Sequence, residues 1–335
     1  MGRVHAALFL VTACFSSAFS QGLPEKLTAL QSQLDSPKVA DRKAAASELG
    51  DLWHSTYFLG QGTLPEKMDA FRPVLKVASA HLLDKDENVR HEVDKSLLQI
   101  ADGSPGQIWT GLDTEFSNAL RQGDLDTRRD LTDLLAISLK AWPSLMPQLA
   151  GFAQSEDAKL ALYSRVCLRL CGVADPDRTY RFLLDGFNSK DANARERTAK
   201  TNNDLVLLMW GQFAPDEVSD FLNQHIRFYQ YPGAAGQVNF NVPESYRTKV
   251  LSAVKLHLSD SDAAVRDLCA KAALKVAQYQ DRWLSFGGDS KAEADEPEVL
   301  KVVDIAIAQS KDADPKLAHD FSEVRKKLVG LRIVT

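Results

Sequence analysis

The chain has 335 residues, of which 44% are hydrophobic and 25% charged, and its formal net charge is −5. Its length allows two ordinary domains or one long array, and its hydrophobic content is high enough for a continuous core, which excludes a disordered chain. The acidic balance gives no electrostatic reason to expect a nucleic-acid ligand. After residue 20, no stretch reaches the roughly 18 to 20 apolar residues that an integral membrane span requires.

Residues 1–20 read as an export signal. Arg3 supplies the positive charge at the start, Ala6–Ala13 are apolar, and Ala18-Phe19-Ser20 form a small-x-small cleavage site. Cleavage there would leave Gln21 as the first residue of the mature protein. We therefore expect a signal peptide over residues 1–20 and a secreted or periplasmic protein.

Two other interpretations of this segment stay open. The first is a buried N-terminal helix. The segment has no polar face and no helix cap, and both absences argue against this interpretation. The second follows from Val11-Thr12-Ala13-Cys14, which resembles the bacterial lipobox. That resemblance implies a lipidated Cys14 as the mature N-terminus and a protein anchored to the cell envelope.

Six stretches of the chain repeat one pattern, an acidic turn followed by Arg and by small or branched apolar residues. The clearest copies are Asp84–Arg90 and Asp260–Arg266, which share the order Asp-x-Asp-x-x-Val-Arg, and fainter copies begin at Ser36, Asp124, Asp157 and Asp191. Successive copies are 38, 33 and 34 residues apart from Asp86 to Asp191, and the last step, to Asp262, is 71 residues. A step of about twice the usual length indicates that one marker has been lost before Asp262.

Each repeat has room for two helices of about 12 to 15 residues with their turns. Asp86 precedes one apolar stripe of Val89, Val93, Leu97 and Ile100, so the Asp is a natural N-cap for that helix. The other helix of each pair is expected between the acidic markers, with prolines at or near its start; examples are Arg72–Leu83 and Ser245–Leu258. The pattern predicts an all-α chain of roughly seven helix hairpins over residues 21–335.

The order Asp-x-Asp-x-x-Val-Arg, followed by Ala and Leu at helical spacing, resembles the HEAT-repeat family and its shorter bacterial HEAT-like variants. This resemblance implies an α-solenoid, a superhelix of stacked hairpins, that binds a partner along a curved surface. It also implies that Asp86, Arg90, Asp262 and Arg266 form structural contacts between repeats.

No metal, cofactor or common catalytic motif is expected. Three cysteines remain after the leader, Cys167, Cys171 and Cys269, and they are interpreted as small buried residues because no further zinc ligands lie nearby. The acidic turn at Asp84 imitates the opening of a calcium-binding EF-hand loop but lacks its Gly and its Glu. The histidines, His81 and His257 among them, are scattered singly, and each is interpreted as a surface or hydrogen-bonded side chain.

Two stretches interrupt the repeat pattern. Trp53–Pro65 lengthens the first repeat and is interpreted as a cap for the exposed end of the array. His225–Pro243 combines aromatic residues with Pro and Gly, which predicts an insertion loop at about residues 228–243. The candidate partner contacts in and beside this loop are Arg227, Phe228, Tyr229, Tyr231 and Phe240. The alternative is that these aromatic side chains fill the groove of the protein's own array.

The function predicted from these patterns is an exported, non-catalytic scaffold that binds a protein or peptide. One alternative is an enzyme or ligand carrier, since some short HEAT-like proteins resemble bilin-attaching lyases. Another is a structural envelope lipoprotein anchored at Cys14.

Overall fold

The computed structural model describes residues 22–60, 62–101, 104, 106–138, 140–209, 244–285, 290–310 and 314–331. Within these ranges the regular structure consists of fourteen α-helices and three short 3-10 helices, with no strand, so the all-α prediction is confirmed. None of these helices is long and apolar enough to cross a bilayer. The predicted signal peptide, Cys14 and the insertion at 228–243 lie outside the described residues.

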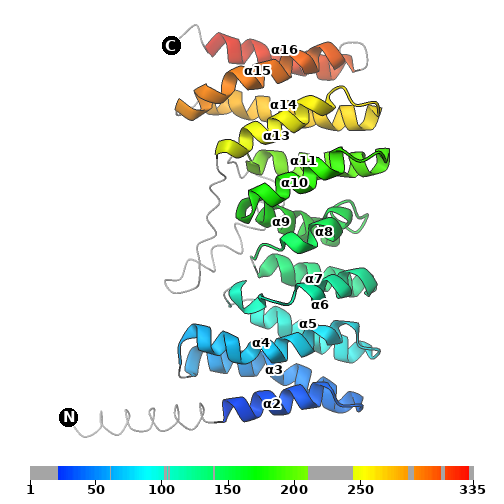
Figure 1. Cartoon of the computed structure of the whole chain (residues 1–335), viewed down its shortest axis with the longest axis vertical. Helices are drawn as coiled ribbons and strands as arrows, with labels where there is room; N and C mark the ends of the chain where they lie inside the picture. Colours follow the sequence, from blue (N-terminus) through cyan, green and yellow to red (C-terminus); the bar gives the residue numbers. More distant parts are fainter. Residues whose placement is uncertain are drawn as a thin grey trace, which may run out of the picture. The chain divides into compact units, whose positions relative to one another are not determined.

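The described residues fall into two compact units, which meet in sequence between Lys140 and Ala141. The first unit contains α2 (Leu23–Leu34), α3 (Val39–Leu59), α4 (Leu64–Ala80), α5 (Glu87–Ala101), α6 (Asp113–Gln122) and α7 (Leu125–Ile137), with 3-10 turns at His81–Leu83 and Gly106–Trp109. Consecutive helices pair into three hairpins, α2–α3, α4–α5 and α6–α7. The first helices of the hairpins contact one another in one layer, and the second helices α3, α5 and α7 form the other (Figure 1).

The second unit repeats this arrangement with four described hairpins. Its helices are α8 (Met146–Phe152), α9 (Ala158–Ala174), α10 (Pro176–Phe187), α11 (Ala192–Met209), α13 (Glu244–His257), α14 (Ala263–Ser285), α15 (Ser290–Ser310) and α16 (Pro315–Leu331). The second helices lie side by side, because α11 contacts both α9 and α14, and α14 contacts α16 (Figure 1). Each unit is therefore a stack of helix hairpins of the α-solenoid type.

The acidic markers stand where the second helices begin. Asp86 Oδ1 accepts hydrogen bonds from the backbone amides of Asn88 and Val89, and Asp124 and Asp157 cap α7 and α9 in the same way. Such a cap stabilises a helix by roughly 1 kcal/mol. Asp314 caps α16 through the Leu317 amide, and the repeat pattern did not reveal this cap.

The predicted apolar stripe of the second repeat forms part of the core. Val89, Val93, Leu97 and Ile100 of α5 are all fully buried. On the facing helix α3, a Cβ added to Gly50 would lie 2.5 Å from Gln99 Oε1 and 3.4 Å from Ser96 Cα. The absence of a side chain at Gly50 thus allows α3 and α5 to pack closely.

Two expectations about the first unit are wrong in detail. The helix expected at Arg72–Leu83 begins eight residues earlier, at Leu64, and runs through Pro73. Its start is fixed by the Glu66 carboxylate, which accepts a hydrogen bond of 2.7 Å from the Thr63 amide. The stretch from Trp53 to Leu59, expected to be irregular, is the last part of α3.

The inference of a lost repeat before Asp262 is also wrong. Helix α11, which follows Asp191, packs directly against α14, which follows Asp262. Among the described helices no hairpin stands between these two, so the 71-residue step does not correspond to two steps of the stack.

A close approach between α10 and α11 gives a testable stability prediction. A Cβ on Gly186 would lie 2.1 Å from Thr198 Oγ1 and 3.0 Å from Thr198 Cγ2, whereas a Cβ on Gly151 of α8 would meet nothing within 4 Å. Gly186→Ala is expected to lower the free energy of unfolding by about 1 to 3 kcal/mol, because α11 must shift. Gly151→Ala, the control, is expected to raise it by up to about 1 kcal/mol. Urea unfolding compares the two variants, and similar effects would contradict the close approach.

Candidate functional site

The acidic turn before α5 joins the hairpins α2–α3 and α4–α5. The Arg42 guanidinium of α3 donates to both carboxylate oxygens of Asp84, at 2.8 Å from Nε and 3.0 Å from Nη2. Asp84 also accepts a hydrogen bond of 2.9 Å from the Asp86 amide, and His81 Nδ1 lies 2.9 Å from Asp84 Oδ2. Together with Arg90, these residues are called the first turn cluster.

The electrostatics of this cluster favour an ionised Asp84. Only 5% of its side chain is exposed, and this burial alone would raise its pKa. The hydrogen bonds from Arg42, from the Asp86 amide and from His81 outweigh that effect and lower the pKa of Asp84 to about 2. The same contact raises the pKa of Arg42, so both members of the pair are charged near neutral pH.

The turn before α14 repeats this geometry in the second unit. Arg195 of α11 donates from Nε to Asp260 Oδ2 and from Nη2 to Oδ1, both at 3.1 Å. The Asp262 amide donates to Asp260 at 2.8 Å, and His257 Nδ1 lies 3.1 Å from Asp260 Oδ2. Burial raises the pKa of Asp260, but these hydrogen bonds outweigh it and lower the pKa to about 2. With Arg266, these residues are the second turn cluster.

The four residues that the HEAT resemblance marked as structural all lie in the turn clusters. Asp86 and Asp262 cap α5 and α14, and Arg90 and Arg266 donate from Nη1 to the Asp84 and Asp260 carbonyl oxygens at 2.9 and 2.7 Å. Arg90 also reaches Asp124, the cap of the next hairpin, at 3.4 Å.

Sequence reasoning missed the central acceptors Asp84 and Asp260 and their His partners. His81 and His257 are hydrogen-bonded side chains, as interpreted, but they are not unrelated to each other, because both belong to a longer shared pattern, His-Leu-x-Asp-x-Asp-x-x-Val-Arg. Comparing the two clearest copies a few residues further upstream would have revealed it. The side chains of both clusters bind one another and nearby backbone groups, so the arrangement joins hairpins rather than forming a reactive centre.

The three cysteines of the described chain are buried and unbridged. Burial raises the pKa of Cys171 and of Cys269 to about 12, so neither thiol is ionised near neutral pH. Cys171 Sγ accepts a hydrogen bond of 3.2 Å from the Trp142 amide. Among the described residues, no group of three or more His, Cys, Asp or Glu side chains is placed to hold a metal ion.

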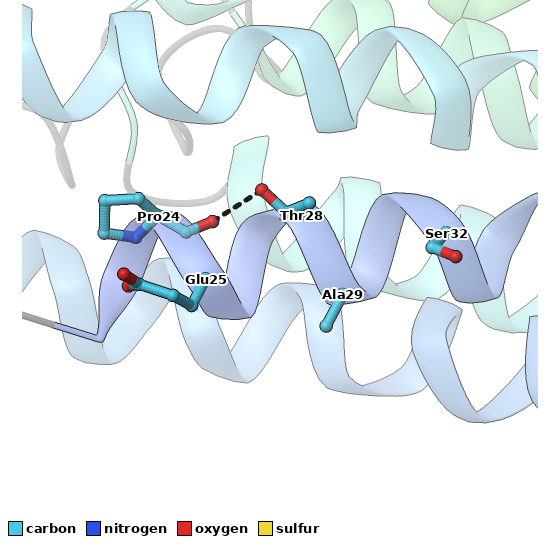
Figure 2. Close-up of a pocket in the computed structure, with 5 residues that line it drawn as sticks. All are labelled: Pro24, Glu25, Thr28, Ala29 and Ser32. Carbon is cyan, nitrogen blue, oxygen red and sulfur yellow. Dashed lines mark hydrogen bonds between the residues drawn. The ribbon is translucent and has the colours of Figure 1, made fainter.

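A shallow depression of about 460 Å³ lies along α2 (Figure 2). Only side chains of this one helix line it: Pro24, Glu25, Thr28, Ala29 and Ser32. The Thr28 hydroxyl donates to the Pro24 carbonyl oxygen at 2.8 Å. Among the five lining residues, Glu25 is the single charged one. One carboxylate among small side chains provides no chemistry for catalysis.

The C-terminal end of α3 carries two exposed apolar side chains. Phe58 is 63% exposed and the adjacent Leu59 is 71% exposed, whereas Trp53 is buried against Phe71 with ring centroids 5.0 Å apart. The expected end cap therefore divides into two parts. Trp53 belongs to the α3–α4 core, and Phe58 and Leu59, together with Leu64 and Pro65, form what is here called the apolar tip.

The candidate partner contacts Arg227, Phe228, Tyr229, Tyr231 and Phe240 lie outside the described residues, as does Cys14. The insertion and its binding role therefore stay predictions.

Comparison with known proteins gives similarity at the level of solved structures. No family model matches the sequence, and no curated protein matches it. The crystal structure of the archaeal HEAT-like repeats protein from Thermococcus onnurineus NA1 is 12% identical, with 91% of this chain and 97% of that chain covered and a TM-score of 0.39. A designed armadillo repeat protein in complex with the peptide (KR)4 is 11% identical over 75% of this chain and 97% of that chain, with a TM-score of 0.37. These values are low, so the α-solenoid fold of this chain rests on its own stacked hairpins.

Proposed function

We propose that this protein is an exported, non-catalytic scaffold that binds a protein or peptide partner along its stacked second helices. The observation that supports this proposal is the way successive hairpins are joined. Arg42–Asp84 and Arg195–Asp260 are two-point ion pairs that tie one second helix to the turn before the next. A stack fixed in this way holds several helices in register and offers a surface longer than a single helix provides.

The insertion at about 228–243 is the proposed specific contact. Aromatic side chains and Arg dominate the energetics of protein interfaces, and Arg227, Phe228, Tyr229, Tyr231 and Phe240 combine these residue types. A loop carried by a rigid scaffold is a frequent position for binding residues. The predicted localisation is secreted or periplasmic, with anchoring at Cys14 as the alternative.

Capture from the secreted or envelope fraction of the source cells tests the binding role. We expect the wild type to retain a defined partner, and a variant with the five candidate residues changed to Ala to lose it while its thermal unfolding stays unchanged. A matched control changes exposed charged residues of the first unit, such as Lys76 and Lys95, to Ala. Loss of folding in the five-residue variant would instead show that these side chains belong to the core.

Mass spectrometry of the mature N-terminus tests the export role separately. A chain that starts at Gln21 supports a released protein, and a diacylated Cys14 supports the anchored alternative. An intact N-terminus in the cell interior would contradict both.

A further inference from the structure

The hairpins α2–α3 and α10–α11 are equivalent parts of the two units. Each supplies the Arg of a turn cluster, and that Arg makes one further bond within its own hairpin. Arg42 donates from Nη1 to the Ser36 carbonyl oxygen, six residues earlier, at 2.9 Å. Arg195 donates in the same way to the Ser189 carbonyl oxygen at 3.0 Å. Because the backbone surrounds both Arg side chains alike, the two hairpins can be compared residue by residue.

The second helices of these hairpins differ at one core position. Seven residues after the cluster Arg, α3 has Leu49 and α11 has Asn202, and both side chains are fully buried. The Asn202 carboxamide carries two donor hydrogens and an acceptor oxygen. Neither its Oδ1 nor its Nδ2 has a hydrogen-bond partner in the described part of the chain. Burial of such a group without replacement bonds is unfavourable, whereas burial of Leu49 is favourable.

Helices α10 and α11 pack closely beside this carboxamide (Figure 1). Thr198 lies one turn before Asn202 on α11, and its hydroxyl donates to the Ala194 carbonyl oxygen at 2.9 Å. A Cβ on Gly186 of α10 would overlap the same Thr198 hydroxyl oxygen. A contact this close excludes a layer of water from the interface, so water is a poor substitute for the missing bonds of Asn202.

The apolar contribution of α10 to this hairpin is small. Its buried side chains are Thr179, Leu183 and Phe187. The equivalent helix α2 buries three leucines. Phe187 stacks on His257 of α13 with ring centroids 4.4 Å apart. The other side-chain link to α13, the ion pair of Asp177 with Lys249, is 71% and 42% exposed, so it contributes little to stability.

Helix α11, in contrast, is firmly joined to α14. Arg195 forms its two-point ion pair with Asp260 at the start of the helix. Further along, Asn203 Nδ2 donates to the Leu268 carbonyl oxygen at 3.3 Å, and Lys275 Nζ donates to the Asn203 carbonyl oxygen at 3.2 Å. These bonds do not involve α10, so α11 keeps its place in the stack when α10 moves away.

We propose that the α10–α11 hairpin is a conformational device: α10 separates from α11 within the folded protein while α11 stays on α14. Separation returns the Asn202 carboxamide to water, where it recovers its hydrogen bonds, and this favours the open form. The open form also presents Leu183 and Phe187, an apolar surface that the closed form buries. The equivalent hairpin of the first unit has Leu49 and lacks the device. This inference depends neither on export nor on a protein partner.

Native-state hydrogen exchange of the full chain in low urea tests the proposal. The amides of α10 are expected to exchange about tenfold or more faster than those of α13, its neighbour in the layer of first helices, with little dependence on urea. Asn202→Leu is expected to slow the exchange of α10 about tenfold or more, and Asn202→Val makes the same chemical change with less added volume. Asn193→Leu, on the exposed start of α11, is the control and should leave the exchange of α10 unchanged.

Three results would contradict the device. Exchange of α10 as slow as that of α13 would mean that the carboxamide is satisfied in the closed form, for example by an internal water molecule. Fast exchange of α10 that neither Asn202 variant slows would mean that the opening has another cause. Exchange of α10, α11 and α14 at one common rate would mean that the second unit opens as a whole. Partner capture and the N-terminal mass spectrum are unaffected by all three.

Discussion

Asp84→Asn is expected to lower the free energy of unfolding of the first unit by on the order of 3 kcal/mol. The carboxylate is 5% exposed and accepts three kinds of donor, from Arg42, His81 and the Asp86 amide. Asparagine keeps the shape of the side chain, but it leaves the charge of Arg42 unpaired in a half-buried position. The expected consequence is weaker joining of the hairpins α2–α3 and α4–α5.

Urea unfolding measures this loss, and hydrogen exchange locates it in α3 and α5. Arg90→Ala in the same cluster is the matched comparison. Arg90 donates to the Asp84 carbonyl oxygen at 2.9 Å, but its ion pair with Asp124 is long, at 3.4 Å, and Asp124 is 56% exposed, so removal of Arg90 should cost only about 1 kcal/mol. Equal losses in the two variants would contradict the central position of Asp84.

Acid is expected to weaken both units through Asp84 and Asp260. Their pKa values are about 2 in the folded protein and about 3.8 when exposed, so the folded state binds fewer protons between these values. Their contribution to stability is fully present above pH 4 and is lost as the pH falls from about 4 to about 2. Between pH 5 and pH 2.5 the two carboxylates together should remove about 3 kcal/mol from the free energy of unfolding.

Urea unfolding at these two pH values checks the sign and the size of the effect. The double variant Asp84→Asn/Asp260→Asn has lower stability at pH 5 but should lose about 3 kcal/mol less than the wild type on acidification. Parallel losses in the wild type and the double variant would show that other carboxylates cause the acid response.

Local features of the fold were predictable from the sequence. An N-cap such as Asp86 and a stripe such as Val89, Val93, Leu97 and Ile100 depend on residues within a few turns of one another, so their spacing is visible in the chain. The caps at Asp124, Asp157 and Asp262 were found in the same way. Asp314 was not, because Ala318 stands where the stronger repeats have Arg.

Contacts between hairpins were not predictable in the same way. Asp84 binds an Arg that lies 42 residues earlier, and Asp260 one that lies 65 residues earlier, so neither pairing follows from local spacing. The same limit explains the supposed lost repeat. The spacing between repeats is a number of residues, whereas the order of stacking depends on which helices contact each other. The residues between α11 and α13 increase the spacing but leave α14 in contact with α11.

The candidate site was predictable only as far as its residue types allowed. The sequence showed aromatic residues at two interruptions of the repeat pattern. It did not show which of these side chains are buried. Helix length decides this for Trp53–Leu59, because α3 continues past α2 while α4 covers one face of it. One interruption thus contributes Trp53 to the core and Phe58 to the surface.

The joining of successive second helices through their acidic turns is tested most directly by a double-mutant cycle on Arg195 and Asp260. The free energies of unfolding of the wild type, Arg195→Ala, Asp260→Ala and the double variant give the coupling between the two side chains. Direct stacking of α14 on α11 predicts a coupling of about 1 to 3 kcal/mol. Additive effects, with a coupling below about 0.5 kcal/mol, would mean that the two helices are not neighbours and would contradict the proposed stack.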